Sequence, residues 1–519
     1  MSPPARQLDT ASDSGRRGSA LGGLRRPERL EAGSLTYERG GSPYPPRVPR
    51  RERGGSGEPP RSTPIGPRAL RRSTRRAPGT VLIVTLWILV VLAGMVLVLA
   101  RAMRVEAICS ANSLAFEQAA AAEQGAIEYV LAGLDGLNGQ VPAETDLLCY
   151  GVQVGSGAFW IVRPDREDDR QLSYGLADEA AKINVNTATG EVLLGLPEMM
   201  ADVPPAVIDW RDSDSDLTAG GAESEYYLLL ADPYECKNAP LETVEELLLV
   251  RLVSRDLLFG EDANRNGVLD DNENDADASD PPDDSNGHLD RGIFDLVTVY
   301  SREPNAAPDG SPRVNVNEAQ TRELARVLAE AVSEERLPTI LDRARRGRPF
   351  QSILDFFYRT GLTPEEFTLL ADRITTRGGR NYAGLLNVNT ASREALLCLP
   401  GLDDSDVTAL LAGRPAGAAQ SGDIAWVTDV LSQEKAMAIG PYITTRSYQF
   451  SADLVSISAD GRAFKRCRIV VDATESPPRV VYRQDLTHLG WPLSPDIVSL
   501  LRSGVSLEEV LETTRQEAQ

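Results

Sequence analysis

The strongest constraint on this chain is an uncharged apolar run from Thr80 to Ala100, which reads TVLIVTLWILVVLAGMVLVLA. A helix rises about 1.5 Å per residue, so this run spans roughly 30 Å, the thickness of a bilayer core. The run continues without a proline into a segment rich in Ala, Glu, Gln and Leu. This composition favours one continuous helix of about 50 residues, which would anchor the chain in a membrane and extend into a folded domain.

The outer half of this helix is predicted to pack one face against the folded domain. The candidates for that face are Leu114, Ala121, Ile127, Val130 and Leu131. Arginines flank the apolar run unequally, with Arg71, Arg72, Arg75 and Arg76 before it and Arg101 and Arg104 after it. Because the more basic side of a span usually faces the cytoplasm, we expect a single-pass protein with a cytoplasmic N-terminus. A secretory signal would have a shorter apolar region and a small-x-small cleavage site.

Charge is distributed unevenly along the 519 residues. The formal net charge is −22, but residues 1–79 contain 17 Arg against 7 acidic residues and carry +10, which leaves −32 on the rest. Residues 1–79 lack an apolar period and are predicted to be a disordered basic leader or cytoplasmic tail. Their charge alone would also suit nucleic-acid or anionic-lipid binding. The acidic body argues against a protein that binds polyanions, because such a surface needs clustered cations.

The cysteines and histidines exclude several kinds of site. The five cysteines at 109, 149, 236, 398 and 467 form no CxxC pair, so a zinc site is excluded, while the spacing allows one or two disulfides. The chain has only two histidines, His288 and His488, so few residues could serve a mechanism that needs a histidine base. Histidine-based catalysis is therefore not expected, and the chain is predicted not to be an enzyme.

Candidate strands lie at both ends of the domain. Residues 150–163 predict two short strands around a turn, and residues 448–458, 462–472 and 479–483 predict three more. Asp460-Gly461 is a strong hairpin signal between the first two of these. The pattern predicts an α+β fold in which one antiparallel sheet is interrupted by a large helical insertion. Residues 494–512 are predicted to form a terminal amphipathic helix.

The insertion is internally repetitive. The words INVNTA (183–188), VNVNEA (314–319) and LNVNTA (386–391) recur, each followed by helical patterns and closed by a Thr-containing stretch at 297–301, 374–378 or 443–447. Such recurrence predicts three related units of helix-hairpin-helix type. The last polar residue of each word is predicted to cap the next helix.

The predicted organisation follows in chain order. A leader covers 1–79, the long helix 80–136 and the first part of the sheet 137–182. Three repeat units cover 183–301, 314–378 and 386–447, and the first of them includes an acidic loop at 260–292. The returning strands cover 448–485 and a helical tail 486–519.

The most specific motif is DANRNGVLDDNE at 262–273, which fits the calcium-loop pattern D-x-[DN]-x-[DN]-G-x5-E at every required position. Calcium takes six to eight hard oxygen ligands at about 2.4 Å. The predicted ligands are Asp262, Asn264, Asn266, the Val268 carbonyl, Asp270 and Glu273, while Gly267 permits the sharp turn. The sequence after Glu273 predicts no second helix, so the loop would have one flanking helix and a structural role.

Two other acidic clusters are weaker candidates. A second ion is predicted at Asp280, Asp284, Asn286 and Asp290, although the twelfth position there does not fit the loop pattern. Asp209, Asp212, Asp214 and Asp216 are predicted to form a solvated loop with some affinity for cations. Acid catalysis by such carboxylates would lack a nucleophile.

Helix-hairpin-helix modules can hold a DNA phosphate on the N–H groups of a helix N-terminus. The hairpin at Leu399–Asp403 suggests this use, but Asp403 replaces the second glycine and Asp404 follows it. Two carboxylates at that place would oppose phosphate binding. The repeats are therefore predicted to be packing modules, with a membrane-anchored periplasmic DNA receptor as the alternative.

Several of these segments together resemble the protein K family of type II secretion systems. Members of this family are large minor pseudopilins. The resemblance covers about residues 77–485 and rests on the apolar run, ADEAAKINVNTA, GGAESEYY, NAPLETVEELLLV, the calcium loop, LDRG and the NVN words. It implies a pilin-like sheet with a large helical insertion, calcium binding, and association with pseudopilins I and J. It also implies prepilin peptidase and an inner-membrane assembly platform as partners, and no nucleic acid.

The resemblance implies specific roles at the N-terminal end of the helix. Gly79 would precede the bond cut by prepilin peptidase, and Thr80 would become the methylated N-terminal residue. Val84, the fifth residue from Thr80, stands where other pilin-like proteins have Glu, and this suits a subunit at the filament tip. Pro78 and the long leader depart from the usual pattern. The implied function is to start and cap a periplasmic pseudopilus that exports folded proteins across the outer membrane, from an inner-membrane anchor.

Overall fold

The computed structural model describes residues 79–143, 145–164, 168–279 and 281–517. The predicted tail therefore lies outside the described residues, apart from Gly79. Helix α1 runs without a break over Thr80–Leu134, which confirms the prediction of one long helix. It is the one helix in the described part of the chain that is long and apolar enough to cross a membrane, and its most apolar window is fully exposed.

The sheet has seven strands, all antiparallel, drawn from both ends of the domain. Strands β1 (Val152–Val154), β2 (Gly157–Pro164), β3 (Leu172–Tyr174) and β4 (Ala177–Asp178) come before the insertion. Strands β13 (Gln449–Ile457), β14 (Phe464–Asp472) and β15 (Arg479–Asp485) come after it. The order β1-β2-β13-β14-β15, with β3 paired to β2 and β4 to β13, confirms the prediction of one interrupted sheet.

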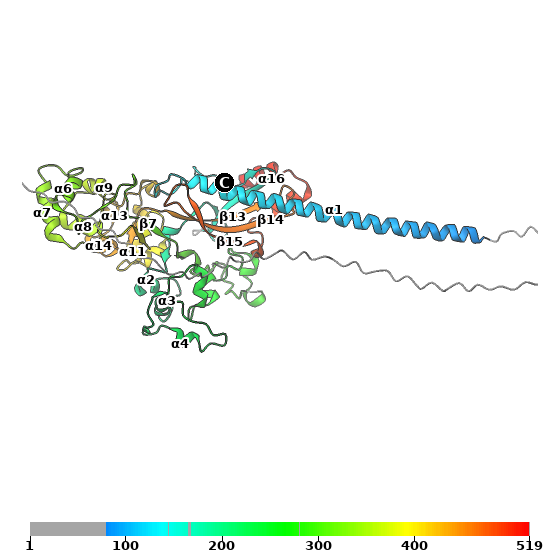
Figure 1. Ribbon diagram of the computed structural model, residues 1–519, viewed down its shortest axis with the longest axis horizontal. Coiled ribbons are helices and arrows are strands. Elements are labelled where there is room, and N and C mark those ends of the chain that lie inside the picture. The colour runs from blue at the N-terminus through cyan, green and yellow to red at the C-terminus, as the bar shows by residue number, and fades with distance from the viewer. Residues whose placement is uncertain (1–78, 144, 165–167, 280, 518–519) are drawn as a thin grey trace, which may run out of the picture. The chain divides into compact units, whose positions relative to one another are not determined.

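One face of the sheet packs against the C-terminal half of α1 (Figure 1). Phe159 and Ile161 of β2 share a buried cluster with Ile127 and Val130 of α1, and Ser456 donates a hydrogen bond to the Ala119 carbonyl at 3.0 Å. The predicted packed face was partly wrong, because Leu114 and Ala121 are exposed. The buried face is instead formed mainly by small residues, Ala115, Ala119, Ala122 and Ala126, which let the helix approach the strands closely.

The opposite face of the sheet is covered by the C-terminal tail. Strand alternation turns Ala158, Trp160 and Val162 toward this face. They pack against α15 (Pro495–Ser503) and α16 (Leu507–Glu517), which replace the single predicted terminal helix. The break falls at Gly504, whose positive φ of 96° ends α15. The central strand β13 is therefore buried on both faces.

The first two residues of each NVN word form a short strand. This strand pairs in parallel with the Thr-containing stretch at the end of the same unit. Strand β5 (Ile183–Asn184) pairs with β6 (Val297–Thr298), β8 (Val314–Asn315) with β9 (Ile374–Thr375), and β11 (Leu386–Asn387) with β12 (Ile443–Thr444). A short antiparallel pair, β7 (Arg302–Pro304) with β10 (Asn381–Ala383), lies between the units. The first and last segments of each unit are thus joined by hydrogen bonds.

Two successive pairs of short helices lie between the paired strands of each unit (Figure 1). In the first unit these are α2 (Gly190–Leu194), α3 (Val203–Arg211), η2 (Val244–Leu249) and α5 (Arg255–Phe259), with α4 (Ser224–Tyr227) between the pairs. The second has α6 (Thr321–Leu328), α7 (Leu337–Gly347), α8 (Ile353–Thr360) and α9 (Pro364–Leu370). The third has α10 (Arg393–Leu397), α11 (Asp404–Gly413), α13 (Val427–Val430) and α14 (Gln433–Ile439), with α12 (Ala418–Ser421) between the pairs. The helix-hairpin-helix assignment of these pairs stays a prediction.

The repeated asparagines have a structural use. The side chain of the second Asn of each word makes hydrogen bonds with backbone groups far along the chain. Asn186 exchanges two hydrogen bonds with the backbone of Leu241, and Asn317 exchanges two with that of Phe350. Asn389 donates to the Ala418 carbonyl at 2.9 Å and accepts from the Trp426 indole at 3.0 Å. The word recurs because a buried amide can both donate to and accept from groups that the loop would otherwise leave unpaired.

The predicted helix caps were wrong by two residues. The side chains of Thr189 and Ser392 cap α2 and α10, rather than Thr187 and Thr390. In the second unit the N-cap is Gln320, whose side chain makes no capping bond. Thr390 instead donates to the Asp178 carboxylate at 2.5 Å. Its hydroxyl therefore bonds to a buried carboxylate from a distant segment and not to the backbone of the next helix.

Replacing Asn389 by Ala should lower the free energy of unfolding by about 2 kcal/mol, because the buried indole N–H of Trp426 loses its acceptor. Urea unfolding followed by tryptophan fluorescence measures the change. Gln433→Ala, at an exposed position of the same unit, is the matched control and should shift the midpoint little. Equal midpoints for the two variants would contradict the role given to the repeated amide.

Candidate metal centre

The side chains of the first half of the loop 262–273 turn toward its own backbone. Asp262, which is 7% exposed, accepts hydrogen bonds from the amides of Asn266 at 3.0 Å and Gly267 at 2.8 Å. Asn264 accepts from the Asn266 amide at 2.9 Å, and Asn266 from the Val268 amide at 2.7 Å. Gly267 has a φ of 75°, the left-handed conformation that glycine adopts without strain. The loop is therefore wound around the oxygens of its first, third and fifth residues.

The second half of the loop closes the ring. Glu273 accepts from the amides of Ala263 at 2.9 Å and Asp270 at 3.1 Å, and so joins the two ends of the loop. Asp270 accepts from the side-chain amides of Asn264 at 2.6 Å and Asn266 at 3.1 Å. All five predicted side-chain ligands thus make hydrogen bonds within the loop. Among the described residues of 271–292, helical structure is limited to two 3₁₀ turns, η3 (Asp271–Glu273) and η4 (Ala276–Ala278), so α5 is the one α-helix that flanks the loop.

The donor set fits calcium in its chemistry. It consists of three carboxylates, two side-chain amides and the Val268 carbonyl, and calcium prefers such oxygen ligands. In the described part of the chain, no three His, Cys, Asp or Glu side chains lie close enough together to hold a metal ion. Asn264 and Asn266 donate their amide N–H groups to Asp270, so binding would require these amides to present oxygen to the ion.

The carboxylates of the loop are poorly solvated. Burial raises the pKa of Asp262 to about 6, partly offset by the amides of Gly267 and Asn266. Burial also raises the pKa of Glu273 to about 7, and the charge of Asp262 adds to this shift. A bound cation would remove the cost of keeping these charged groups together in a buried loop.

The second predicted ion site is only partly within the described residues, because Asp280 lies outside them. Asp284 accepts from the Asn286 amide at 3.0 Å, and Asp290 from the Gly292 amide at 2.9 Å, so both side chains form local turns. The sequence interpretation missed Glu261, whose carboxylate accepts from the amides of Asp284 and Asp290, each at 3.3 Å. Glu261 therefore ties the two halves of this loop together, and the second ion stays a prediction.

The acidic cluster after α3 differs from its prediction as a solvated loop. Asp214 and Asp216 are exposed, but Asp209 is fully buried and accepts from the Thr218 amide. Glu223, which sequence reasoning also missed, is 6% exposed. Both of its carboxylate oxygens and Asp212 Oδ1 are buried without a well-formed hydrogen bond. Burial, then the charge of the neighbouring aspartates, raises the pKa of both Asp212 and Glu223.

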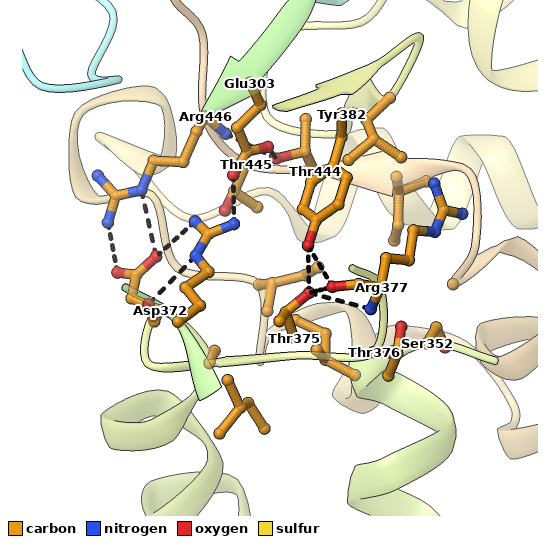
Figure 2. Close-up of a pocket in the computed structure, with 18 of the residues that line it drawn as sticks. Glu303, Ser352, Asp372, Thr375, Thr376, Arg377, Tyr382, Thr444, Thr445 and Arg446 are labelled. Carbon is orange, nitrogen blue, oxygen red and sulfur yellow. Dashed lines mark hydrogen bonds and ion pairs between the residues drawn. The ribbon is translucent and has the colours of Figure 1, made fainter. Parts of the chain in front are cut away.

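A polar pocket of about 80 Å³ lies between the second and third units (Figure 2). Four of its charged side chains form two ion pairs, Arg313 with Glu303 at 2.6 Å and Arg446 with Asp372 at 2.5 Å, and Arg377 donates to the Pro441 carbonyl. Thr444 donates to Glu303 at 2.6 Å, as Figure 2 also shows. The pocket therefore serves as a polar joint between units.

The helix N-terminus suggested for phosphate binding is occupied by its own cap. Asp403 accepts from the amides of Ser405 and Asp406, both at 3.0 Å, and Lys435 pairs with it at 3.0 Å. The hydrogen bonds from Ser405 and Lys435 hold the pKa of Asp403 well below its usual range. A phosphate would have to displace this carboxylate, so the geometry opposes the DNA alternative.

The structure also shows whether the cysteines form disulfides. None of the five is disulfide-bonded. Burial raises the pKa of the Cys236 thiol to about 11 and that of Cys398 to about 12, so these two thiols are protonated at neutral pH.

A membrane-length helix packed on an antiparallel sheet, with a helical insertion between the strands, matches the α+β fold predicted from the sequence. Residues 192–258 match a family model described as type II secretion system (T2SS), protein K. The resemblance to the protein K family is thereby confirmed, in a segment of the first repeat unit that ends just before the calcium loop. No match was found among curated proteins.

Among solved structures, the chain is similar to one from the crystal structure of the GspK–GspI–GspJ complex of the enterotoxigenic Escherichia coli type 2 secretion system. The sequence identity is 13% and the TM-score 0.35, over 74% of this chain and 98% of the other.

Removing calcium should lower the melting temperature of the protein, because the ion neutralises the buried carboxylates of the loop. Glu273→Gln should reproduce this loss in the presence of calcium and leave little further effect of chelator. Asp271→Asn, at the neighbouring exposed position, is the matched control. A melting temperature that is the same with calcium and with chelator would remove the calcium proposal.

The stabilisation by calcium should also depend on pH. The pKa values of Asp262 and Glu273 are raised to about 6 and 7, so protons compete with calcium as the pH falls through this range. In the calcium-free protein the same shifts favour folding at lower pH, where the carboxylates are neutral. The rise in melting temperature on adding calcium should therefore be large at pH 7.5 and small at pH 5.5. An equal rise at both pH values would contradict the assignment.

Proposed function

We propose that this chain is a minor pseudopilin of a type II secretion system, with a structural rather than an enzymatic role. The observation that carries the proposal is the packing of a membrane-length helix against a sheet, combined with the protein K match in the inserted region. A helix whose N-terminal half is apolar and exposed needs a bilayer or neighbouring helices around it. Both environments are provided by the membrane and the helical core of a pseudopilus.

The proposed place is the tip of the pseudopilus. Val84 is an uncharged residue of α1 at the position where a pilin-like subunit would use a carboxylate to meet the N-terminus of its neighbour. A carboxylate in hydrocarbon is costly unless it is paired, so a subunit with no neighbour ahead of it gains nothing from one. The three repeat units would enlarge this tip beyond the sheet.

The proposed life cycle begins at the inner membrane, with the N-terminus in the cytoplasm and residues after the span in the periplasm. Prepilin peptidase would cut between Gly79 and Thr80, and Thr80 would then be methylated. Gly79 lies in a turn directly before α1, which leaves the bond outside the helix. The assembly platform would then add the subunit, together with pseudopilins I and J, to start and cap the filament for export of folded proteins.

Calcium would serve the proposed function by holding the inserted head in one conformation. The loop 262–273 is the proposed site. A rigid head suits a tip subunit, because it must resist the load of a filament that pushes substrate through a channel.

The full-length chain, extracted in detergent in the presence of millimolar calcium, should co-purify with pseudopilins I and J when all three are expressed together. A single-span periplasmic protein of unrelated fold, with the same tag, controls for trapping in shared detergent micelles. Recovery of the chain without either pseudopilin while calcium is present would contradict the proposed function.

A further inference from the structure

Arg466 of β14 is one of the largest fully buried side chains among the described residues, with 0% of its surface exposed. Neighbouring residues of this strand, Cys467 and Ile469, face α1, so strand alternation directs Arg466 to the opposite face of the sheet. There its guanidinium donates two hydrogen bonds to Asp453 of the adjacent strand β13, at 3.1 and 2.8 Å. The guanidinium is therefore held in a fixed orientation by the sheet itself.

The remaining donors of Arg466 reach into the calcium loop. Nη1 donates to the Asn264 carbonyl and Nη2 to the Arg265 carbonyl, both at 2.6 Å. These carbonyls belong to the third and fourth residues of the loop, between the predicted ligands Asn264 and Asn266. A planar guanidinium presents its N–H groups in a rigid fork, so it fixes the direction of both peptide groups.

Other contacts press the same loop against the sheet. A Cβ atom on Gly267 would come within 2.8 Å of the Pro164 backbone at the end of β2. The Leu269 amide donates to the Asp169 carbonyl at 2.7 Å, and Arg291 donates to the Gly267 carbonyl at 2.7 Å. The loop is thus docked on strands that precede and follow the insertion, on the face away from α1.

We infer that Arg466 is a positioning residue for calcium, which couples binding in the inserted loop to the pilin-like sheet. By holding the backbone of Asn264 and Arg265, Arg466 sets the spacing of the ligands on either side before an ion arrives. In return, an ion that rigidifies the loop stabilises the bond between the loop and β14. The inference rests on the calcium role proposed above and adds to it a mechanical link between the ion and the sheet.

The sign of the effect separates positioning from simple electrostatics. Arg466 carries a positive charge and interacts with the Asp262 carboxylate. If charge alone mattered, removing Arg466 would strengthen calcium binding, because one repelled cation would be gone. If Arg466 positions the ligands, removing it must weaken binding despite the relief of repulsion.

Isothermal titration of calcium into the full-length protein in detergent tests the inference, with Arg466→Met and Arg466→Lys. Both variants should bind calcium at this loop at least about tenfold more weakly than the unmodified protein, as residues that orient metal ligands generally do. The heat of calcium binding that is lost in Glu273→Gln identifies the part of the signal that comes from this loop. Arg466→Lys keeps a charge beside Asp453, so it serves where the Met variant fails to fold.

Arg468→Met is the matched control. Arg468 lies two residues away on the same face of β14 and pairs with the same Asp453 at 3.6 Å, and no described hydrogen bond joins it to a carbonyl of 262–273. Its removal should leave calcium affinity unchanged or slightly higher. An equal loss of affinity in the Arg466 and Arg468 variants would overturn the inference, as would unchanged or tighter binding in both Arg466 variants.

Hydrogen exchange supplies a second readout of the coupling. Calcium should slow amide exchange around Asp453 and Arg466 as well as in the loop, and this distant protection should disappear in Arg466→Lys. Protection confined to the loop in the unmodified protein would overturn the coupling. Absence of any calcium heat from the loop in the unmodified protein would overturn the proposed calcium role itself, and so distinguishes the two failures.

Discussion

The structure depends on the pairing of β2 with β13, two strands separated in sequence by the entire insertion. Residues 158–162 align with residues 453–457, from Ala158 opposite Ile457 to Val162 opposite Asp453. This pairing creates two buried faces at once, because alternate residues of both strands point to opposite sides. One face receives α1 and the other receives the C-terminal helices. A break in this register would expose both faces together.

The insertion is tied to that sheet by a corner of buried carboxylates at β4 and the 3₁₀ turn η1 (Glu179–Ala181). Asp178 accepts from Thr390 and Ser447 at 2.5 and 2.6 Å, which attaches the third repeat unit. Glu179 accepts from Ser451 at 2.6 Å and from Thr298, which attaches β13 and the first unit. Lys182 balances the charge of Glu179 at 2.6 Å. The corner is thus a polar joint whose directional bonds specify how the units meet.

The calcium loop adds a third attachment, at the far side of the sheet from α1. Its own hydrogen bonds give it the shape of an ion-binding loop, while Arg466 and Pro164 fix its position on the sheet. Under the proposed calcium role, the ion would offset the cost of burying the charged carboxylates of Asp262 and Glu273. Stability of the head and occupancy of the loop are therefore expected to change together.

Local patterns in the sequence determined much of this protein. The apolar run predicted α1, and the alternating segments predicted β2, β13 and β14. These predictions succeeded because each depends on the periodicity of residues that are close in the chain. The calcium-loop motif identified a segment that folds around its own carboxylates, and calcium binding there stays a prediction. The three NVN words were found for the same reason, although their hydrogen bonds to distant backbone were not foreseen.

Only the tertiary structure decided which groups from distant segments would meet. Leu114 was expected in the core and is exposed, because the small residue Ala115 of the same turn occupies the buried face of α1 instead. Glu223 and Glu261 carry no motif of their own, and their roles arise from loops that fold back on them. Arg466 belongs to no motif in the sequence, and it contacts the backbone of the loop only because β14 lies beneath that loop. Such contacts depend on three-dimensional proximity, and no periodicity along the chain encodes them.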